Sequence, residues 1–229
     1  SLIYLKIKNY DSEDKATQEI LKILTYLPQV KQHYMILLSI MKTDRYSLKK
    51  ILQKLLNLTI RYNYIAQGQA NKQETIYNRI ACNISAQQYT STDDIIKDLN
   101  SSDLEVTDEE FISKFSKKQF ANEKLDRFIL AKIEEYFDPH NKIDYDNETI
   151  EHITDKSLEP DYINLMGNLT LLTKSDNNNL SGKTYNEKKQ FYSTHARHIV
   201  NMINMKEWNL EAVKSRSEEL AKIATKLFK

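Results

Sequence analysis

The stretch Gly167-Asn168-Leu169-Thr170-Leu171-Leu172-Thr173 is a short apolar segment with interspersed threonines, and it predicts a β-strand. Before residue 138, apolar side chains recur almost everywhere at helical spacing instead. The 229 residues include only three Gly and three Pro, which is too little turn chemistry for an all-β fold. We therefore expect a mainly α protein that contains this strand. The segment 141–154 lacks helical spacing and is predicted to be a second strand or an extended loop.

Helix ends are indicated by prolines and capping residues. Apolar spacing predicts helices that end near Pro28 and before Pro139. Capping boxes begin at Ser91, Thr107 and Thr184. The last of these predicts a helix from residue 184 to about 203, after a polar loop at 175–183, and Asn209 is expected to cap a final helix. Because the pattern changes near 138–142, we predict a helical linker or arm over residues 1–140 and a second domain over 141–229.

Composition and charge exclude some classes of protein. The single cysteine, Cys82, excludes an intramolecular disulfide and a cysteine-based zinc site. No run of about 18 apolar residues and no signal peptide is present, so we expect a cytoplasmic protein without a membrane span. The first residue is Ser1 rather than Met, which suggests a fragment of a longer protein.

The charge distribution is only weakly informative about partners. The net charge of +1 argues neither for nor against nucleic acid. Residues 174–229 hold eleven Lys/Arg and six Asp/Glu, a balance of +5, and could face phosphates. An ordinary solvated helix surface would give the same pattern.

Four polar residues in the second region suit phosphodiester hydrolysis: Glu151, His152, Asn168 and Asn177. This reaction needs a base that deprotonates water and a metal ion that stabilises the phosphorane and the leaving oxygen. A neutral imidazole can accept a proton near pH 7. Carboxylate and amide oxygens are hard ligands that suit Mg²⁺ or Mn²⁺. Taken alone, such residues are more often surface side chains or turn formers, so their order along the chain matters.

That order resembles a known family. Ile150-Glu151-His152-Ile153 resembles the "(D/E)HI" signature of HNH nucleases, and 166–172 resembles their "xGNLxLL" strand. Asn177, followed by Leu180-Ser181, Tyr185 and Lys188, resembles their "N…LS…F…K" loop and helix start. With Trp208, Arg216 and Leu220, the pattern over about residues 148–220 is similar to the C-terminal domain of GmrSD-type restriction enzymes.

The resemblance implies a fold and an activity. The fold would be a small ββα-metal (His-Me finger, HNH) nuclease domain embedded in helices, after an N-terminal helical region. The activity would be metal-dependent endonucleolytic cleavage or nicking of DNA in restriction and phage defence. In the family, an N-terminal ParB-like NTPase domain, missing here, recognises modified DNA. DNA would be the partner, and a homo-oligomer is possible. Three questions stay open: which DNA modification is recognised, whether the substrate is RNA instead of DNA, and whether the enzyme nicks one strand or cuts both.

The resemblance also assigns roles to residues. His152 would be the general base and Asn168 would orient its ring. Glu151 and Asn177 would bind one Mg²⁺ or Mn²⁺ ion, with Asn178 as the alternative to Asn177. Lys188 would contact the scissile phosphate, although an ordinary exposed lysine on a helix would give the same sequence pattern.

One departure and two further residues complete the prediction. The family usually has Pro at the last position of its "HIxP" motif, where this chain has Asp155 after His152-Ile153-Thr154. Asp155 would assist metal binding or mark an altered site, and a catalytically weak or inactive module that binds DNA or a partner subunit is the alternative function. A third hypothesis is a purely helical interaction scaffold, in which the match to the HNH motifs is accidental. Trp208 is expected to be a packing anchor, and Arg216 to brace the domain through backbone carbonyls.

Overall fold

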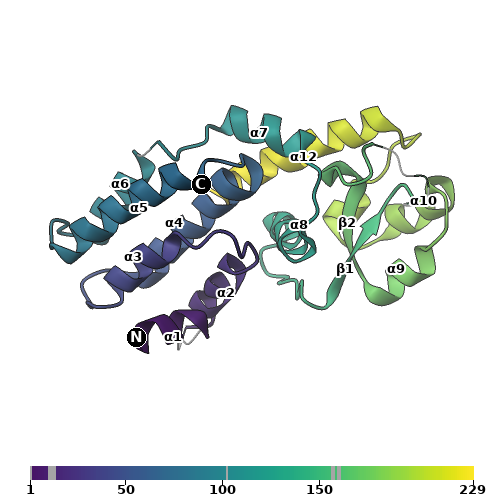
Figure 1. The fold of residues 1–229 in the computed structure, drawn as a ribbon. Coiled ribbons are helices and arrows are strands. Elements are labelled where there is room, and N and C mark those ends of the chain that lie inside the picture. Colours follow the sequence, from purple (N-terminus) through teal and green to yellow (C-terminus); the bar gives the residue numbers. More distant parts are fainter. Residues whose placement is uncertain (1, 10–13, 102, 156–157, 159–160) are drawn as a thin grey trace. The chain divides into compact units, whose positions relative to one another are not determined.

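The chain folds into two compact units, shown by the computed structural model in Figure 1. The structure describes residues 2–9, 14–101, 103–155, 158 and 161–229. The first unit comprises residues 1–107 and 228–229, and the second comprises 108–227. Both units are mainly helical, as predicted, and the second contains a two-stranded sheet. None of the described helices is long and apolar enough to cross a membrane.

The first unit is a group of helices that share an apolar core. Ile36, Ile51 and Ile80, from three different helices, are completely buried. Ser91 and Asp94 form the predicted capping box. The helices are α1 (Leu2–Lys8), α2 (Lys15–Leu24), α3 (His33–Ile40), α4 (Leu48–Leu58), the π-helical η1 (Thr59–Ile65), α5 (Ala70–Ser85) and α6 (Thr92–Asn100).

The second unit combines helices with the two predicted strands. The predicted boundary near 138–142 lies inside this unit, between its second helix and its first strand. Asn209 caps the final helix, as expected, because its Oδ1 accepts a hydrogen bond from the Ala212 N–H at 3.0 Å. The elements are α7 (Asp108–Lys117), α8 (Glu123–Phe137), β1 (Glu148–His152), the 3-10 turn η3 (Met166–Asn168), β2 (Leu169–Thr173), α9 (Lys174–Leu180), α10 (Tyr185–Thr194), α11 (His198–Asn201) and α12 (Leu210–Leu227).

The predicted polar loop at 175–183 is wrong over most of its length, because α9 begins directly after β2. Thr173 caps this helix: its hydroxyl accepts a hydrogen bond from the Asp176 N–H at 3.1 Å. The Asp176 carboxylate also lies in the first turn, where it is favoured by the helix dipole. The three consecutive Asn residues are therefore helical, although Asn is a weak helix former.

The predicted single helix from 184 to about 203 is divided into α10 and α11. His195 has an extended backbone, with ψ of 142°, and so does Arg197, with ψ of 136°. The Glu134 carboxylate of α8 then accepts hydrogen bonds from the His198 and Ile199 N–H groups at 3.0 and 2.9 Å. A buried tertiary carboxylate thus starts a new helix where the sequence pattern alone predicts a continuous one.

Strands β1 and β2 pair antiparallel, with Glu151 opposite Thr170 and His152 opposite Leu169. Side chains alternate along a strand, so Thr149 and Glu151 share one face and His152 points to the other. Helices α8 and α9 contact both strands, and α11 contacts β2. Three helices therefore pack against the two-stranded sheet.

Arg216 of α12 fixes the turn that leads into β2. Its buried guanidinium donates hydrogen bonds to the backbone carbonyls of Gly167 and Leu169, at 2.7 and 2.8 Å, and to that of Ile199 at 2.8 Å. Burial lowers the pKa of Arg216 to about 10. The expectation that Arg216 braces the domain through backbone carbonyls is confirmed.

Candidate functional site

His152 is the last residue of β1, at the point where the strand meets the turn before β2. The pairing continues one residue further, because the Ile153 N–H donates to the carbonyl of Asn168 at 3.0 Å. The His152 side chain is half-buried. Its Nε2 atom lies 3.3 Å from the Oδ1 atom of Asn164, in the connection between the strands.

Glu151 points away from His152, into a buried polar cluster. Its Oε1 atom accepts hydrogen bonds from Nζ of Lys188 at 2.7 Å and from the Tyr192 hydroxyl at 2.9 Å. Lys188 also donates to the carbonyl of His152 at 2.9 Å. Burial raises the pKa of Tyr192, and the nearby charge of Glu151 adds to this. Lys188 is thus a buried partner of Glu151, not the exposed lysine considered from sequence, and its phosphate contact stays a prediction.

Asn168 is completely buried, and its side-chain amide forms hydrogen bonds with backbone groups. Its Oδ1 accepts hydrogen bonds from the Thr154 N–H at 2.9 Å and from the Trp208 indole N–H at 3.0 Å. Its Nδ2 donates to the carbonyl of Ile163 at 2.9 Å. Within the described part of the chain, the structure does not bring the Asn168 amide into hydrogen-bond contact with His152.

Asn177 lies on α9 and faces β1. Its Nδ2 donates to the Thr149 hydroxyl at 2.9 Å and to the carbonyl of Ile150 at 3.1 Å. Asn178, the alternative allowed by the sequence, is exposed. The helix therefore selects Asn177 as the residue that contacts the strand bearing Glu151 and His152.

A known protein family matches just over half of this chain. The family model described as "GmrSD restriction endonucleases, C-terminal domain" matches residues 105–223. The chain belongs to this family. Among curated proteins, no match was found. The GmrSD match extends upstream of the motif residues and includes α7 and α8, both of which belong to the same compact unit as the sheet.

Three side-chain oxygen atoms around β1 decide how well a metal ion fits this GmrSD domain. Both hydrogen bonds to the Glu151 carboxylate from described residues end on Oε1, so Oε2 has no donor among them. The Asn177 amide is likewise held through Nδ2, and its Oδ1 accepts no hydrogen bond from the described residues. Thr170, opposite Glu151, has a buried hydroxyl without a partner in the same part of the chain. Oxygen donors of this kind fit Mg²⁺ or Mn²⁺.

The charge of the cluster limits this fit. The Lys188 ammonium compensates the negative charge of Glu151, which weakens the attraction of the carboxylate for a cation. Among the residues that the structure describes, no group of three or more His, Cys, Asp or Glu could hold a metal. Asp155 is half-buried, and its carbonyl accepts a hydrogen bond from the Leu158 N–H at 3.2 Å. Its role at a metal stays a prediction.

Three residues contact the candidate site residues in ways that were not predicted from the sequence: Tyr192, Trp208 and Asn164. Tyr192 lies four residues after Lys188 on α10, a spacing that places both on one helix face and could have indicated it. Trp208, expected only as a packing anchor, stacks on Tyr185 with ring centroids 5.3 Å apart and also binds Asn168. Asn164 carries no such signal, because only the tertiary fold brings it to His152.

Proposed function

We propose that this GmrSD-family chain is an HNH-type, metal-dependent DNA endonuclease that uses His152 as its general base. The observation that carries the proposal is the return of α9 to β1 through Asn177. The helix follows directly after two paired strands, of which β1 ends at His152 and β2 begins after Asn168. This succession of strand, strand and helix brings three separate motif segments into one unit. It supports a nuclease site better than a purely helical scaffold, which predicts no strands there.

The proposed roles follow from the contacts. His152 takes a proton from water, whose oxygen forms a bond to the phosphorus while the bond to the leaving oxygen breaks. Glu151 Oε2 and Asn177 Oδ1 would hold one Mg²⁺ or Mn²⁺ ion, which would stabilise charge on the phosphate and the leaving group. Lys188 and Tyr192 hold the other carboxylate oxygen and thereby fix the orientation of Glu151. Recognition of a DNA modification would belong to a ParB-like NTPase domain elsewhere in the protein.

Nicking of supercoiled plasmid tests the proposal. With Mg²⁺ or Mn²⁺, the wild-type chain should convert supercoiled DNA to the open-circular form, and EDTA should abolish the reaction. His152→Ala should lower the rate by about 100-fold or more, because a general base contributes about 10²–10⁴-fold. His140→Ala, at an exposed histidine of the same unit, is the matched control and should retain the wild-type rate. Failure of the full-length protein to cleave DNA with any divalent metal would reject the proposal.

The buried Glu151–Lys188 pair favours a second candidate, a module that keeps the fold and binds DNA or a partner without catalysis. Isothermal titration with Mn²⁺ separates the two. The nuclease should bind Mn²⁺, and Glu151→Gln and Asn177→Ala should each weaken binding. A wild-type chain that binds DNA but takes up no Mn²⁺ at millimolar concentration would support the binding module.

A further inference from the structure

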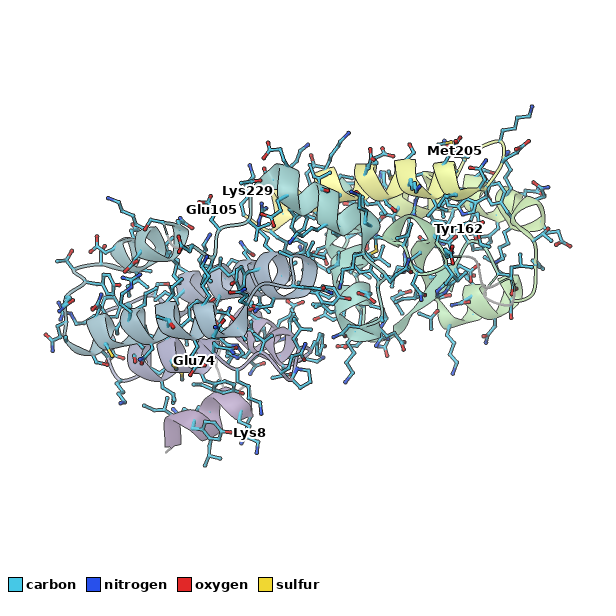
Figure 2. All side chains as sticks on the ribbon, turned by 45° about the horizontal axis from the view of Figure 1, so that its top comes forward. Lys8, Glu74, Glu105, Tyr162, Met205 and Lys229 are labelled. Atoms are coloured by element: carbon cyan, nitrogen blue, oxygen red, sulfur yellow. The ribbon has the colours of Figure 1, made fainter. Side chains whose placement is uncertain are left out.

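The connection between β1 and β2 supplies a side-chain contact to the imidazole ring of His152, the candidate base. Asn164 lies two residues after Tyr162 in the sequence, and Tyr162 is labelled in Figure 2. Its side-chain oxygen Oδ1 lies 3.3 Å from Nε2 of His152. We infer that Asn164 is the positioning residue of His152, a role that the resemblance assigns to Asn168. The inference rests on the proposed function, since it concerns the same base.

The chemistry of the two groups fixes the direction of the hydrogen bond. An amide oxygen can only accept, so Nε2 of His152 must carry the proton that is donated to it. In a neutral imidazole with a proton on Nε2, the basic lone pair belongs to Nδ1. Asn164 therefore selects the tautomer in which Nδ1 is the atom that takes a proton from water.

The backbone around Asn164 is held on both sides, which allows its side chain to impose an orientation. The carbonyl of Asn164 accepts a hydrogen bond from the Phe120 N–H at 2.8 Å, and Leu165 forms an isolated bridge with Gln119. On the other side, the Asn168 amide donates to the carbonyl of Ile163. Asn168 thus acts on His152 indirectly, by fixing the segment from which Asn164 extends.

The roles of the two Asn residues differ in a way that substitution can reveal. Asn168→Ala removes three hydrogen bonds of a completely buried side chain and should mainly reduce stability. Asn164→Ala removes the Nε2 acceptor of His152 and should leave the backbone bonds to Phe120 and Ile163 in place. Asn164→Asp keeps a side-chain oxygen at the same position and serves as the conservative rescue.

Nitrogen-15 NMR of the histidine rings provides the test, because it identifies the protonated ring nitrogen without any cleavage assay. The full chain is labelled with [¹⁵N]histidine, and His152→Gln assigns the His152 signals among the five histidines. At a fixed pH where the ring is neutral, wild type should show the Nε2–H tautomer. Asn164→Ala should increase the Nδ1–H fraction, whereas Asn164→Asp and the exposed control Asn141→Ala should retain Nε2–H.

Cleavage kinetics give a second measure. Asn164→Ala should lower kcat for plasmid nicking by about tenfold to a hundredfold, part of the general-base contribution, with little change in KM. Asn164→Asp should restore most of this loss. A wild-type ring in the Nδ1–H tautomer would overturn the inference without any variant, and so would an unchanged tautomer in folded Asn164→Ala. Absence of cleavage by wild type, together with the expected tautomers, would contradict the proposed function and support the Asn164–His152 contact.

Discussion

Nζ of Lys188 lies 2.7 Å from Oε1 of Glu151, and the two side chains are only 2% and 5% exposed. A pair of this kind is costly to break, because removal of one partner leaves a buried charge without compensation. Lys188→Met should therefore lower the free energy of unfolding by about 3–5 kcal/mol. Urea denaturation followed by circular dichroism measures the change.

Two further variants decide whether the charge pair causes that loss. Lys183→Met, at an exposed lysine near the start of the same helix, should leave the stability unchanged within error. The double variant Glu151→Gln with Lys188→Met removes both charges and should recover part of the stability lost in Lys188→Met. Equal stability of the Lys188→Met and Lys183→Met proteins would contradict the buried pair.

The Asn168–Trp208 contact can be followed by fluorescence, since Trp208 is the only tryptophan of the chain. Asn168→Ala should change the emission of Trp208, because the indole N–H loses its acceptor. The same variant should destabilise the protein by about 1–3 kcal/mol through buried groups left unpaired. Asn186→Ala, at an exposed position of α10, should alter neither quantity. Unchanged emission in Asn168→Ala would show that the contact is absent in solution.

Gly167 and Gly182 allow a comparison between crowding and backbone strain. A Cβ at Gly167 would lie 1.9 Å from the carbonyl oxygen of Val213, so Gly167→Ala should force η3 and α12 apart and cost about 3 kcal/mol or more. Gly182 has φ of +74° and nothing within 4 Å of its Cβ position, so Gly182→Ala should cost only about 1–2 kcal/mol. Thermal denaturation of both variants measures the difference. A smaller loss for Gly167→Ala than for Gly182→Ala would disprove the close contact.

His33 should make stability depend on pH. Burial lowers its pKa to about 4, from an ordinary value of 6.5, and the residue is 3% exposed. Between these values the unfolded chain binds the proton more readily than the folded chain. The stabilisation from neutral His33 is therefore fully present above pH 6.5 and is lost as pH falls toward 4, by about 3 kcal/mol in total.

Urea denaturation at several pH values tests this linkage. His33→Phe should reduce the slope of stability against pH in that window, whereas His140→Phe, at an exposed histidine, should keep the wild-type slope. The same slope in wild type and His33→Phe would mean that His33 does not titrate in this way.

Local sequence signals predicted the strands well and the surroundings of Glu151 poorly. The apolar, Thr-containing run at 169–173 forms β2, and the capping boxes at Ser91 and Thr184 are present. Helix α9 was missed because Asn-rich segments favour turns, while its stability comes from the Thr173 cap and from contacts with the sheet. Local reasoning is sufficient where neighbours in sequence provide the partners.

The partners of the candidate site come from distant parts of the chain instead. Glu151 and Lys188 are 37 residues apart in sequence, and Trp208 lies 40 residues from Asn168. A lysine at a helix start gives no local indication that it will be buried, and an amide side chain can bond to many groups. Which partner it finds depends on tertiary packing, so motif residues could be named from sequence but their contacts could not.

The guanidinium of Arg216 has a consequence for synthesis on the ribosome. The motif segments 148–173 emerge before α12, yet the carbonyls of Gly167, Leu169 and Ile199 find their donor only in that late helix. A nascent chain that stops short of Arg216 already contains His152, Asn168 and Asn177, but it leaves these carbonyls without their hydrogen-bond donor. We therefore expect the strand pair to reach its final packing only after α12 has been synthesised.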